Sequence, residues 1–598
     1  MANTNSTASL LELDFADLKE SFKTYLRTQP QFKDYDFEGS NINVLLDLLA
    51  YNTYKNNFYH NMVASEMFLD TAQLRPSVVS HAKELNYLPR SRKSAKAKIQ
   101  VNFEATRDSA PYIIPKGSPF TALVKNQAFT FTTAENIVCT SGNNSFSFTT
   151  NIYEGVYVSD SYVIDTSEEF PKYRVTNRNA DIDSLTVSVF EDGSDVAEIY
   201  KKTDTLLGLT DTSLVFFLQA VENGYYEVLF GDNFFGKKPK AGSTLVLNYR
   251  VSAGSPPNGA KQFSVDFDPT GSDELIATPE LTVLEFAANG LEEQTTESIR
   301  LYAPRYFATQ QRAVSSDDYA SIILSKFSGI IDDVTVYGGE TVEPKQYGRV
   351  IIALKPTDNS IAPNYLKDEI SNYMLPYISL PLRVLFTDPD YFHLSINTVV
   401  QYDNRITDKT NNEIIGLVRQ TITDFSSANL EKFDSDFRYS RFVKEIDNTD
   451  DSITSNDTNV TLTKRLFPKT NAYNTYVINF NNALVSSSKK YGIVCSSFFT
   501  YQDEEGINYP LAKICDDSNG VLKVYITSNN TRIYLNNNFG TVNYTTGEVV
   551  LNKFRTTEYG SYLEIHATLA SKDVIMNKNK ILLIDPDDVN INAVNKIQ

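Results

Sequence analysis

The sequence is poor in the residues that build disulfide scaffolds or common metal sites. Its 598 residues include three cysteines, four histidines and no tryptophan. The cysteines Cys139, Cys495 and Cys515 are too few for a disulfide scaffold, and a reducing compartment of synthesis is the simple interpretation. The histidines are isolated, with no HExxH pair and no Cys-x-x-Cys companion, so we expect no metal site.

Long apolar runs and an excess of positive charge are also missing. No run of about 18 apolar residues occurs, and residues 1–15 lack the basic start of a signal peptide, so we expect neither a membrane span nor a leader. The 74 acidic residues outnumber the 55 basic ones, and the net charge of −19 argues against nucleic acid as a main partner. A chain of this length suggests roughly four domains of about 150 residues.

The first helix is predicted over residues 10–29, where apolar residues recur at steps of three and four. Asp14 and Asp17 suit its first turn, and Pro30 stops it. The apolar stripe consists of Leu11, Phe15, Leu18, Phe22, Tyr25 and Leu26.

A second, longer helix is predicted over residues 41–69, with Ser40 as its N-cap. A third helix begins near Pro76 and ends before Pro89. In the second helix, one side carries Leu45, Leu48, Leu49, Tyr59, Met62 and Val63, and Leu46, Tyr54, Phe58 and Phe68 extend the apolar surface around it.

The second helix is too apolar for a single buried face. One interpretation is a self-contained helical domain; the other, which we prefer, is that some of the stripes pack against helices of other chains. Burying each large apolar side chain contributes roughly 1.5–3 kcal/mol, which favours a partner. The predicted interface residues are Leu11, Phe15, Leu18, Phe22, Leu26, Leu45, Leu49, Tyr59 and Met62.

A basic run follows this helical segment. Between Arg90 and Lys98 there are five positive charges and no acid. A solvated linker at a domain boundary is the simpler interpretation, and a docking site for an acidic partner, such as another copy of this chain, is the alternative.

The rest of the chain predicts a multidomain α+β protein. After the N-terminal helical segment (1–90), we expect a β-rich middle domain (98–290), a helical connector (291–330), a sandwich-like α+β domain with antiparallel strands (331–450) and a β-rich C-terminal domain (451–598). Within the connector, Ser315 and Asp318 form a predicted capping box. A helix is expected from about residue 411 to 425.

Motifs of catalysis are weak, and we predict no catalytic, cofactor-binding or metal-binding residues. The segment from Gly231 to Lys238 has almost the spacing of a phosphate-binding loop. However, Lys238 stands where a Ser or Thr should hold magnesium, and a strand follows instead of a helix, so a β-hairpin loop is predicted. Residues 516–520 read as a hairpin turn, and residues 447–451 lack the Gly and Glu of a calcium loop.

Several motifs, in order along the chain, resemble the baseplate wedge protein of T-even-type contractile phages, within the broader baseplate J-like group. Residues 36–91 resemble its start, FGDNFFGKKPKAG resembles the group's central loop, and YGGE and YGRVIIALKP resemble the T-even-type branch, as does the segment from Phe437 to Asn456. Asn233 departs from the usual Gly of the loop, although Asn tolerates positive φ. The group's Ala-Pro, Arg-Ala-Val and Asp-Tyr pattern falls at Ala303, Pro304, Arg312, Ala313, Val314, Asp318 and Tyr319.

The resemblance implies a structural role in the virion tail without chemistry or cofactors. Two copies per wedge would join other wedge subunits through a helical bundle, and the C-terminal half would close an inner, iris-like ring. The ring would contact the sheath-initiating baseplate protein, and its rearrangement would trigger sheath contraction. Assembly would take place in the host cytoplasm.

Two alternatives remain at this point. A tail-associated protein that binds or degrades glycans is one, although tryptophan, the largest stacking surface, is absent. A nucleotide-dependent assembly factor is the other, and it depends only on the loop between Gly231 and Lys238.

Overall fold

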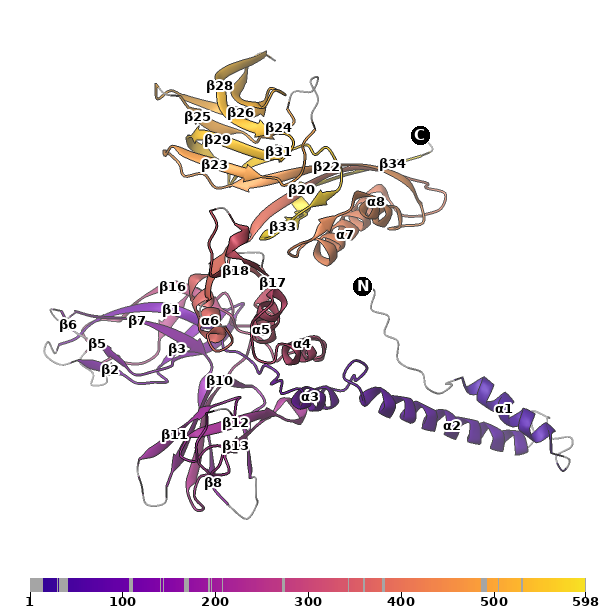
Figure 1. Ribbon diagram of the computed structural model, residues 1–598, viewed down its shortest axis with the longest axis vertical. Helices are drawn as coiled ribbons and strands as arrows, with labels where there is room; N and C mark the ends of the chain where they lie inside the picture. The colour runs from indigo at the N-terminus through magenta and orange to yellow at the C-terminus, as the bar shows by residue number, and fades with distance from the viewer. Residues whose placement is uncertain are drawn as a thin grey trace. The chain divides into compact units, whose positions relative to one another are not determined.

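The structure is a computed structural model that describes residues 14–29, 31, 41–106, 111–139, 141–142, 145–165, 171–191, 194, 196–206, 208–270, 275–342, 344–358, 361–378, 382–485, 492–503, 505–528 and 531–596. The chain divides into two compact units (Figure 1). Unit 1 is formed by Met1–Gln311 with Ser328–Ile330, and unit 2 by Arg312–Phe327 with Ile331–Gln598. No helix among the described residues has the length and apolar character to cross a membrane.

Unit 1 begins with three helices, as predicted. They are α1 (Phe15–Arg27), α2 (Asn41–Glu66) and α3 (Arg75–Glu84). Asp14 is the N-cap of α1 and accepts a hydrogen bond from the backbone N–H of Ala16 at 2.7 Å. Helix α2 is three residues shorter than expected, while Leu11, Pro30 and the predicted cap Ser40 lie outside the described residues.

The first sheet of unit 1 is built from alternating strands, which bury every second residue. In β1, for example, Ile99 and Val101 are fully buried, and Phe120 and Phe131 of the next strands join the same core. The strand order is β15-β3-β4-β7-β1-β16, with β6 paired to β7, and all its ladders are antiparallel. The bounds are β1 (Lys96–Glu104), β3 (Pro119–Val124), β4 (Gln127–Thr133), β6 (Ser141–Gly142), β7 (Ser145–Glu154), β15 (Phe263–Val265) and β16 (Glu280–Ala288); β2 (Tyr112–Ile114) pairs separately with β5 (Ile137–Cys139).

The second sheet of unit 1 packs against helices. Its core residues Leu245 and Tyr249 cluster with Val78 of α3 and with Ile299 of α4 (Thr296–Ala308), so α3 is rooted in this β domain. The order is β8-β14-β10-β11-β12-β13-β9, antiparallel throughout except for β11 and β12. The bounds are β8 (Val156–Val163), β9 (Lys172–Arg174), β10 (Ala180–Phe190), β11 (Ala197–Lys202), β12 (Val215–Ala220), η1 (Glu222–Gly224), β13 (Tyr226–Phe230) and β14 (Thr244–Val251).

Residues of the basic run form hydrogen bonds and ion pairs with other segments of unit 1. The guanidinium of Arg90 donates to the backbone carbonyl of Ser328, and Arg92 forms an ion pair with Glu292 at 2.9 Å. The backbone N–H of Arg90 also donates to the side chain of Gln294, which is 1% exposed. The interpretation as a solvated linker was therefore wrong for Arg90, whose partners lie within the chain.

Unit 2 begins with the predicted capping box and a small sheet. The N–H of Asp318 donates to the Ser315 hydroxyl and the N–H of Ser315 donates to the Asp318 carboxylate, at 3.2 and 2.8 Å. Strands β17 and β18 pair antiparallel, but β19 departs from the expected antiparallel pairing, because a helix between β18 and β19 returns the chain in the parallel sense. The elements are α5 (Ser316–Phe327), β17 (Ile331–Gly338), η2 (Gly339–Thr341), β18 (Arg349–Pro356), α6 (Asn364–Met374) and β19 (Arg383–Thr387), in the sheet order β17-β18-β19.

A 13-stranded sheet dominates the remainder of unit 2. Its long strand β20 pairs antiparallel with β22 on one side and parallel with both β33 and β34 on the other. The main order is β23-β29-β28-β27-β26-β24-β31-β22-β20-β33, with β25, β30 and β34 off this path. The bounds are β20 (Asp390–Tyr402), β22 (Ile453–Leu466), β23 (Asn474–Asn479), β24 (Val494–Ser496), β25 (Phe499–Gln502), β26 (Asn508–Asp516), β27 (Val521–Ser528), β28 (Thr531–Asn543), β29 (Glu548–Phe554), β30 (Thr556–Tyr559), β31 (Leu563–Ala567), β33 (Lys580–Leu583) and β34 (Val589–Asn595).

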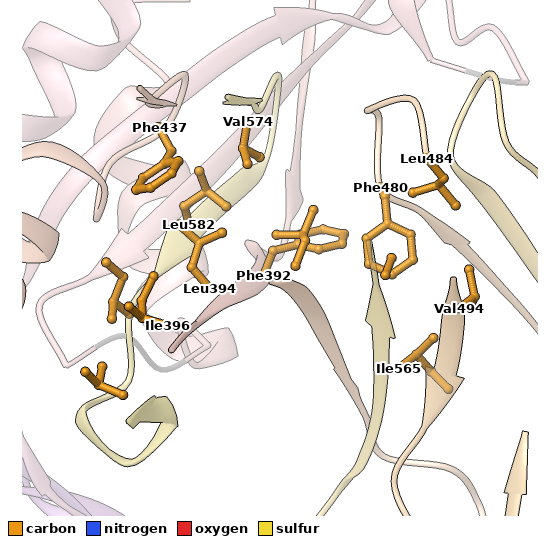
Figure 2. Close-up of a cluster of buried hydrophobic side chains, with 14 of the residues drawn as sticks. Phe392, Leu394, Ile396, Phe437, Phe480, Leu484, Val494, Ile565, Val574 and Leu582 are labelled. Carbon is orange, nitrogen blue, oxygen red and sulfur yellow. The ribbon is translucent and has the colours of Figure 1, made fainter. Parts of the chain in front are cut away.

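One apolar core runs through this part of unit 2. Phe392 and Leu394 of β20 meet Phe480, Ile565 and Leu582 (Figure 2), and the ring centroids of Phe392 and Phe480 are 5.7 Å apart. The expected division at residue 450 falls inside this core. The same cluster includes α7 (Asn411–Asn429) and α8 (Tyr439–Asp447); β21 (Asp436–Phe437) pairs with β32 (Val574–Ile575), and η3 (Pro586–Asp588) precedes β34.

The predicted fold class is confirmed. An N-terminal helical segment, β-rich domains and a β-rich C-terminal region with a few helices make a mixed, multidomain α+β protein.

Candidate interface helix

Helix α2 carries large apolar residues on nearly every side, but the described part of unit 1 covers only one of them. Helices α1 and α2 lie side by side (Figure 1), and Lys19 of α1 pairs with Asp47 of α2 at 2.5 Å. The buried positions of α2 are Asn43, Leu46, Ala50 and Asn61, which recur at steps of three, four and eleven residues along one stripe. A helix that is hydrophobic all round is normally buried all round.

The other sides of α2 present an apolar surface to solvent. We call these residues the outer face of α2; each side chain is between 40 and 63% exposed. The outer face consists of Val44, Leu45, Leu48, Leu49, Tyr51, Phe58, Tyr59, Met62 and Val63. Met67 and Phe68, just past the helix, are each 65% exposed and continue it. An exposed apolar surface of this size marks an interaction site in a folded protein.

The predicted interface residues divide into two groups. The α1 residues Leu18, Phe22 and Leu26 are half-buried, and Phe15 is 37% exposed. The α2 residues of the prediction are all exposed on the outer face: Leu45, Leu49, Tyr59 and Met62. Leu11 lies outside the described residues. The structure therefore does not place all nine predicted residues on one surface.

Sequence reasoning placed one residue wrongly and omitted two. Leu46, expected to extend the open apolar surface, is 5% exposed. Val44 and Tyr51 were not singled out, yet they are 61 and 50% exposed on the outer face. Their signal was present, because residues 44, 48 and 51 follow the three- and four-residue steps of one helix side.

The end of α2 is fixed by polar contacts to α3 and to the loop that precedes α3. The carboxylate of Glu66 accepts hydrogen bonds from the backbone N–H groups of Gln73 and Leu74, at 2.8 and 3.2 Å. His81 of α3 contacts the Glu66 carbonyl at 2.9 Å. Burial opposes the charge of Glu66, but these hydrogen bonds outweigh it and lower its pKa. The outer face is therefore presented by a helix with an anchored base.

The loop that resembles a phosphate-binding motif holds its lysine in ion pairs. The ammonium of Lys237 bonds to Glu198 and lies 3.4 Å from Glu191. Strand β14 follows the loop, as predicted, and Asn233, which stands where Gly is common in the related motif, adopts a positive φ of 69°. The positive charge of Lys237 is therefore paired with two carboxylates of the same β domain.

One acidic cluster has the spacing of metal ligands. His393, Asp585 and Asp588 have candidate ligand atoms within 4.8 Å of one another. The guanidinium of Arg465 donates to both carboxylates at 2.9 Å. The positive charge of Arg465 therefore offsets part of the negative charge of the two carboxylates, and these ion pairs connect β22 to η3.

The hairpin turn predicted from residues 516–520 is confirmed between β26 and β27. The N–H of Asp517 donates to the carbonyl of Val521 at 3.0 Å, and Gly520 adopts a φ of 89°.

The exposed apolar outer face of α2 is a feature of proteins that assemble with partners. Comparison with known proteins places the chain more closely. Residues 14–87 match a family described as baseplate wedge protein gp6-like, helical domain. Residues 315–382 and 390–465 match C-terminal domains I and III of baseplate structural protein gp6.

The chain is 25% identical to baseplate wedge protein gp6 of Enterobacteria phage T4, over 86% of this chain and 80% of that protein. These findings confirm the resemblance to baseplate wedge proteins of contractile phage tails. The structure also resembles a chain of the anti-feeding prophage baseplate (TM-score 0.30, 13% identity, 75% of this chain and 86% of that chain). A chain of the type VI secretion TssK-TssF-TssG baseplate subcomplex matches with a TM-score of 0.27, at 9% identity, over 58% and 96%.

Proposed function

We propose that this chain builds the inner ring of a contractile-tail baseplate, links neighbouring wedges and transmits the rearrangement that releases sheath contraction. The match with gp6 of phage T4 along most of the chain supports the baseplate wedge role. The observation that carries the proposal is the outer face of α2, which needs a helical partner that the described residues do not supply.

The outer face provides the binding energy for a helical bundle. We infer that α2 packs against α2 of a second copy and against helices of other wedge subunits. Association costs about 4–15 kcal/mol in lost freedom of motion. Nine half-exposed large side chains, each contributing on the order of 1 kcal/mol when fully buried, reach that range.

Unit 2 would then form the contacts within the ring and with the sheath-initiating protein. A ring that moves between two packings needs rigid bodies, since small shifts are transmitted only through well-packed cores. The continuous core from Phe392 to Ala593 provides such a body. In this proposal the subunit assembles in the host cytoplasm and ends in the virion tail.

The experiment is sedimentation of the full-length chain and of a Leu45→Glu, Leu49→Glu variant. We expect the unaltered chain to self-associate and the variant to dissociate at least 30-fold more readily, since central apolar contacts each contribute about 2 kcal/mol. Val196→Glu is the matched control, because Val196 is 77% exposed on another part of unit 1.

Self-association that survives in the outer-face variant and weakens in the control would contradict the helical-bundle proposal. The ring itself is tested by imaging tail particles assembled with the labelled chain. We expect label in a closed ring around the tail axis, and label confined to peripheral fibres would overturn the inner-ring role.

A further inference from the structure

The 13-stranded sheet of unit 2 has a seam where two half-sheets meet. One half runs from β23 to β26 and the other from β24 to β33. Strand β24 shares three register pairs with β31, and β26 shares four with β27. Between β24 and β26 there is a single pair, Cys495 opposite Cys515. This is the shortest ladder along the main path of the sheet.

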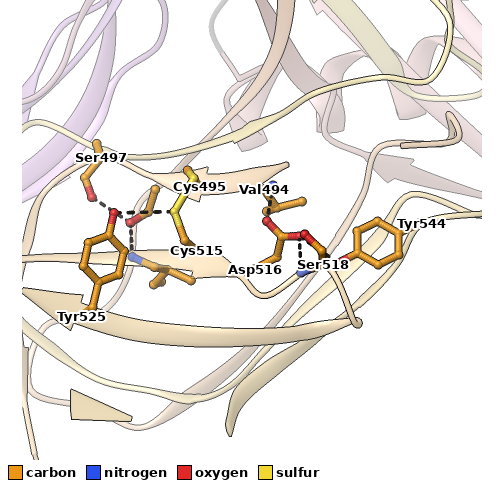
Figure 3. The surroundings of a disulfide bond; sticks show 10 residues. Val494, Cys495, Ser497, Cys515, Asp516, Ser518, Tyr525 and Tyr544 are labelled. Atoms are coloured by element: carbon orange, nitrogen blue, oxygen red, sulfur yellow. Dashed lines mark hydrogen bonds between the residues drawn. A yellow bond between two sulfur atoms is a disulfide. The ribbon is translucent and has the colours of Figure 1, made fainter. Parts of the chain in front are cut away.

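Side chains replace the missing backbone ladder at the seam (Figure 3). The N–H of Val494 donates to the buried Asp516 carboxylate at 3.0 Å, and the N–H of Ile514 donates to the Ser496 hydroxyl at 2.8 Å. The Asp516 carboxylate also accepts from Tyr544 at 2.8 Å. The seam therefore stays hydrogen-bonded at β24 without a covalent link, and farther along the same chain β25 pairs with both β26 and β30.

A disulfide joins Cys495 and Cys515 at this same point, with their Cα atoms 4.4 Å apart. The sequence contained no signal for this pairing, because three cysteines are too few for a scaffold. The remaining thiol, Cys139, is buried in unit 1, and burial raises its pKa to about 11. Cys139 is thus a poor nucleophile and does not compete for the bridge.

We propose that Cys495 and Cys515 form a redox-dependent staple across this seam, a dithiol in a reducing compartment and a disulfide in an oxidising one. Half-sheet closure then changes with the surroundings of the chain. Residues on both sides of the seam, such as Val494 and Ile514, belong to the same apolar core, so the dithiol form stays folded. Only local opening of the seam differs between the two forms.

The oxidation is thiol–disulfide exchange with a low-molecular-weight disulfide, such as oxidised glutathione. Cys495 is half-exposed and Cys515 is 5% exposed, so the Cys495 thiolate attacks first. It forms a mixed disulfide and releases one small thiol. The Cys515 thiolate then attacks the Cys495 sulfur, the intramolecular S–S bond forms and the second small thiol leaves. Two protein thiols are oxidised and one small disulfide is reduced.

The test is hydrogen exchange of the full-length chain, measured by mass spectrometry in reduced and oxidised glutathione buffers. The reporters are the amides of Val494 and Ile514, whose acceptors lie across the seam. We expect exchange on the order of 100-fold slower in the oxidised form, because the bridge closes a 20-residue separation. Peptides of β20 and β22 serve as an internal reference and should not change.

Variants separate the staple from a general effect of the buffer. Cys495→Ser should exchange at the reduced rate in both buffers, and Cys139→Ser should behave as the unaltered chain. If the serine variant folds poorly, reduction of the unaltered chain gives the same comparison. Equal exchange of the seam amides in both buffers, or two alkylatable thiols that persist in oxidised glutathione, would overturn the proposal.

Discussion

Among the residues that the structure describes, α2 and α7 are the two longest helices, and their apolar residues differ in burial. In α7, Ile414, Val418 and Ile422 are fully buried in the core of unit 2. In α2, Leu46 is the only large apolar side chain that is buried. The difference lies in pattern: α7 has one apolar stripe that its own sheet covers, while α2 is apolar on more sides than α1 can cover. The apolar residues of α7 therefore stabilise the fold, while those of α2 remain available to bind a partner.

The largest loss of stability is expected when a buried side chain of α7 is truncated. Ile422→Ala leaves a cavity in the core of unit 2 and should lower the free energy of unfolding by about 2–5 kcal/mol. Chemical denaturation followed by circular dichroism measures the loss. A change below about 1 kcal/mol would contradict the assignment of α7 to a closed core.

Acid should lower the stability of the core of unit 2, which contains α7. Burial, with the nearby charge of Arg465, lowers the pKa of His393 on β20 to about 4. As pH falls from 6.5 towards 4, His393 becomes protonated in the unfolded chain but stays neutral in the folded chain. The free energy of unfolding therefore decreases in that pH window, and the full contribution of His393 is present above it.

The loss should amount to about 2–3 kcal/mol, and denaturation at pH 7, 5.5 and 4.5 measures it. His393→Gln removes the titrating group and serves as the control. The same slope in this variant would assign the pH dependence to other groups.

A smaller effect is expected at the helix cap. Thr410 and Glu413 form a complete capping box at the start of α7. Thr410→Ala should cost about 1 kcal/mol, and Thr410→Ser, which keeps the hydroxyl, should cost little. The two variants are compared by thermal unfolding, and equal losses would show that the hydroxyl does not cap the helix.

The smallest change in stability should come from the outer face of α2. Leu49→Ala removes a side chain that is 54% exposed, so the free energy of unfolding of the dilute chain should shift by no more than about 0.5 kcal/mol. Denaturation at a concentration where the chain is monomeric is the measurement. A loss as large as that of Ile422→Ala would mean that α2 is a core helix after all, and would break the comparison.

Local features of the fold could be predicted, because neighbouring residues determine them. The steps of three and four residues located α1 and α2, and Ser315 with Asp318 announced the start of α5. Asn233 was expected to tolerate a positive φ, and it adopts one.

Pairings between distant strands could not be predicted. The sequence of β20 alternates in a way that suits any sheet, so nothing in it shows that β22, β33 and β34 are its partners. The parallel pair of β18 and β19 has the same difficulty. For the interface, sequence reasoning found that α2 was too apolar, but it could not tell which side α1 covers, and so it misplaced Leu46.

The partners of β20 also determine when this part of the sheet can form during synthesis of the chain. Strand β20 ends at Tyr402, whereas β33 begins at Lys580. At translation rates of 5–20 residues per second, the parallel neighbours leave the ribosome about 10–40 s after β20. Throughout this interval one edge of β20 is unpaired, so chaperones should bind preferentially there. A chain truncated before Lys580 lacks both parallel neighbours and should not complete the fold of unit 2.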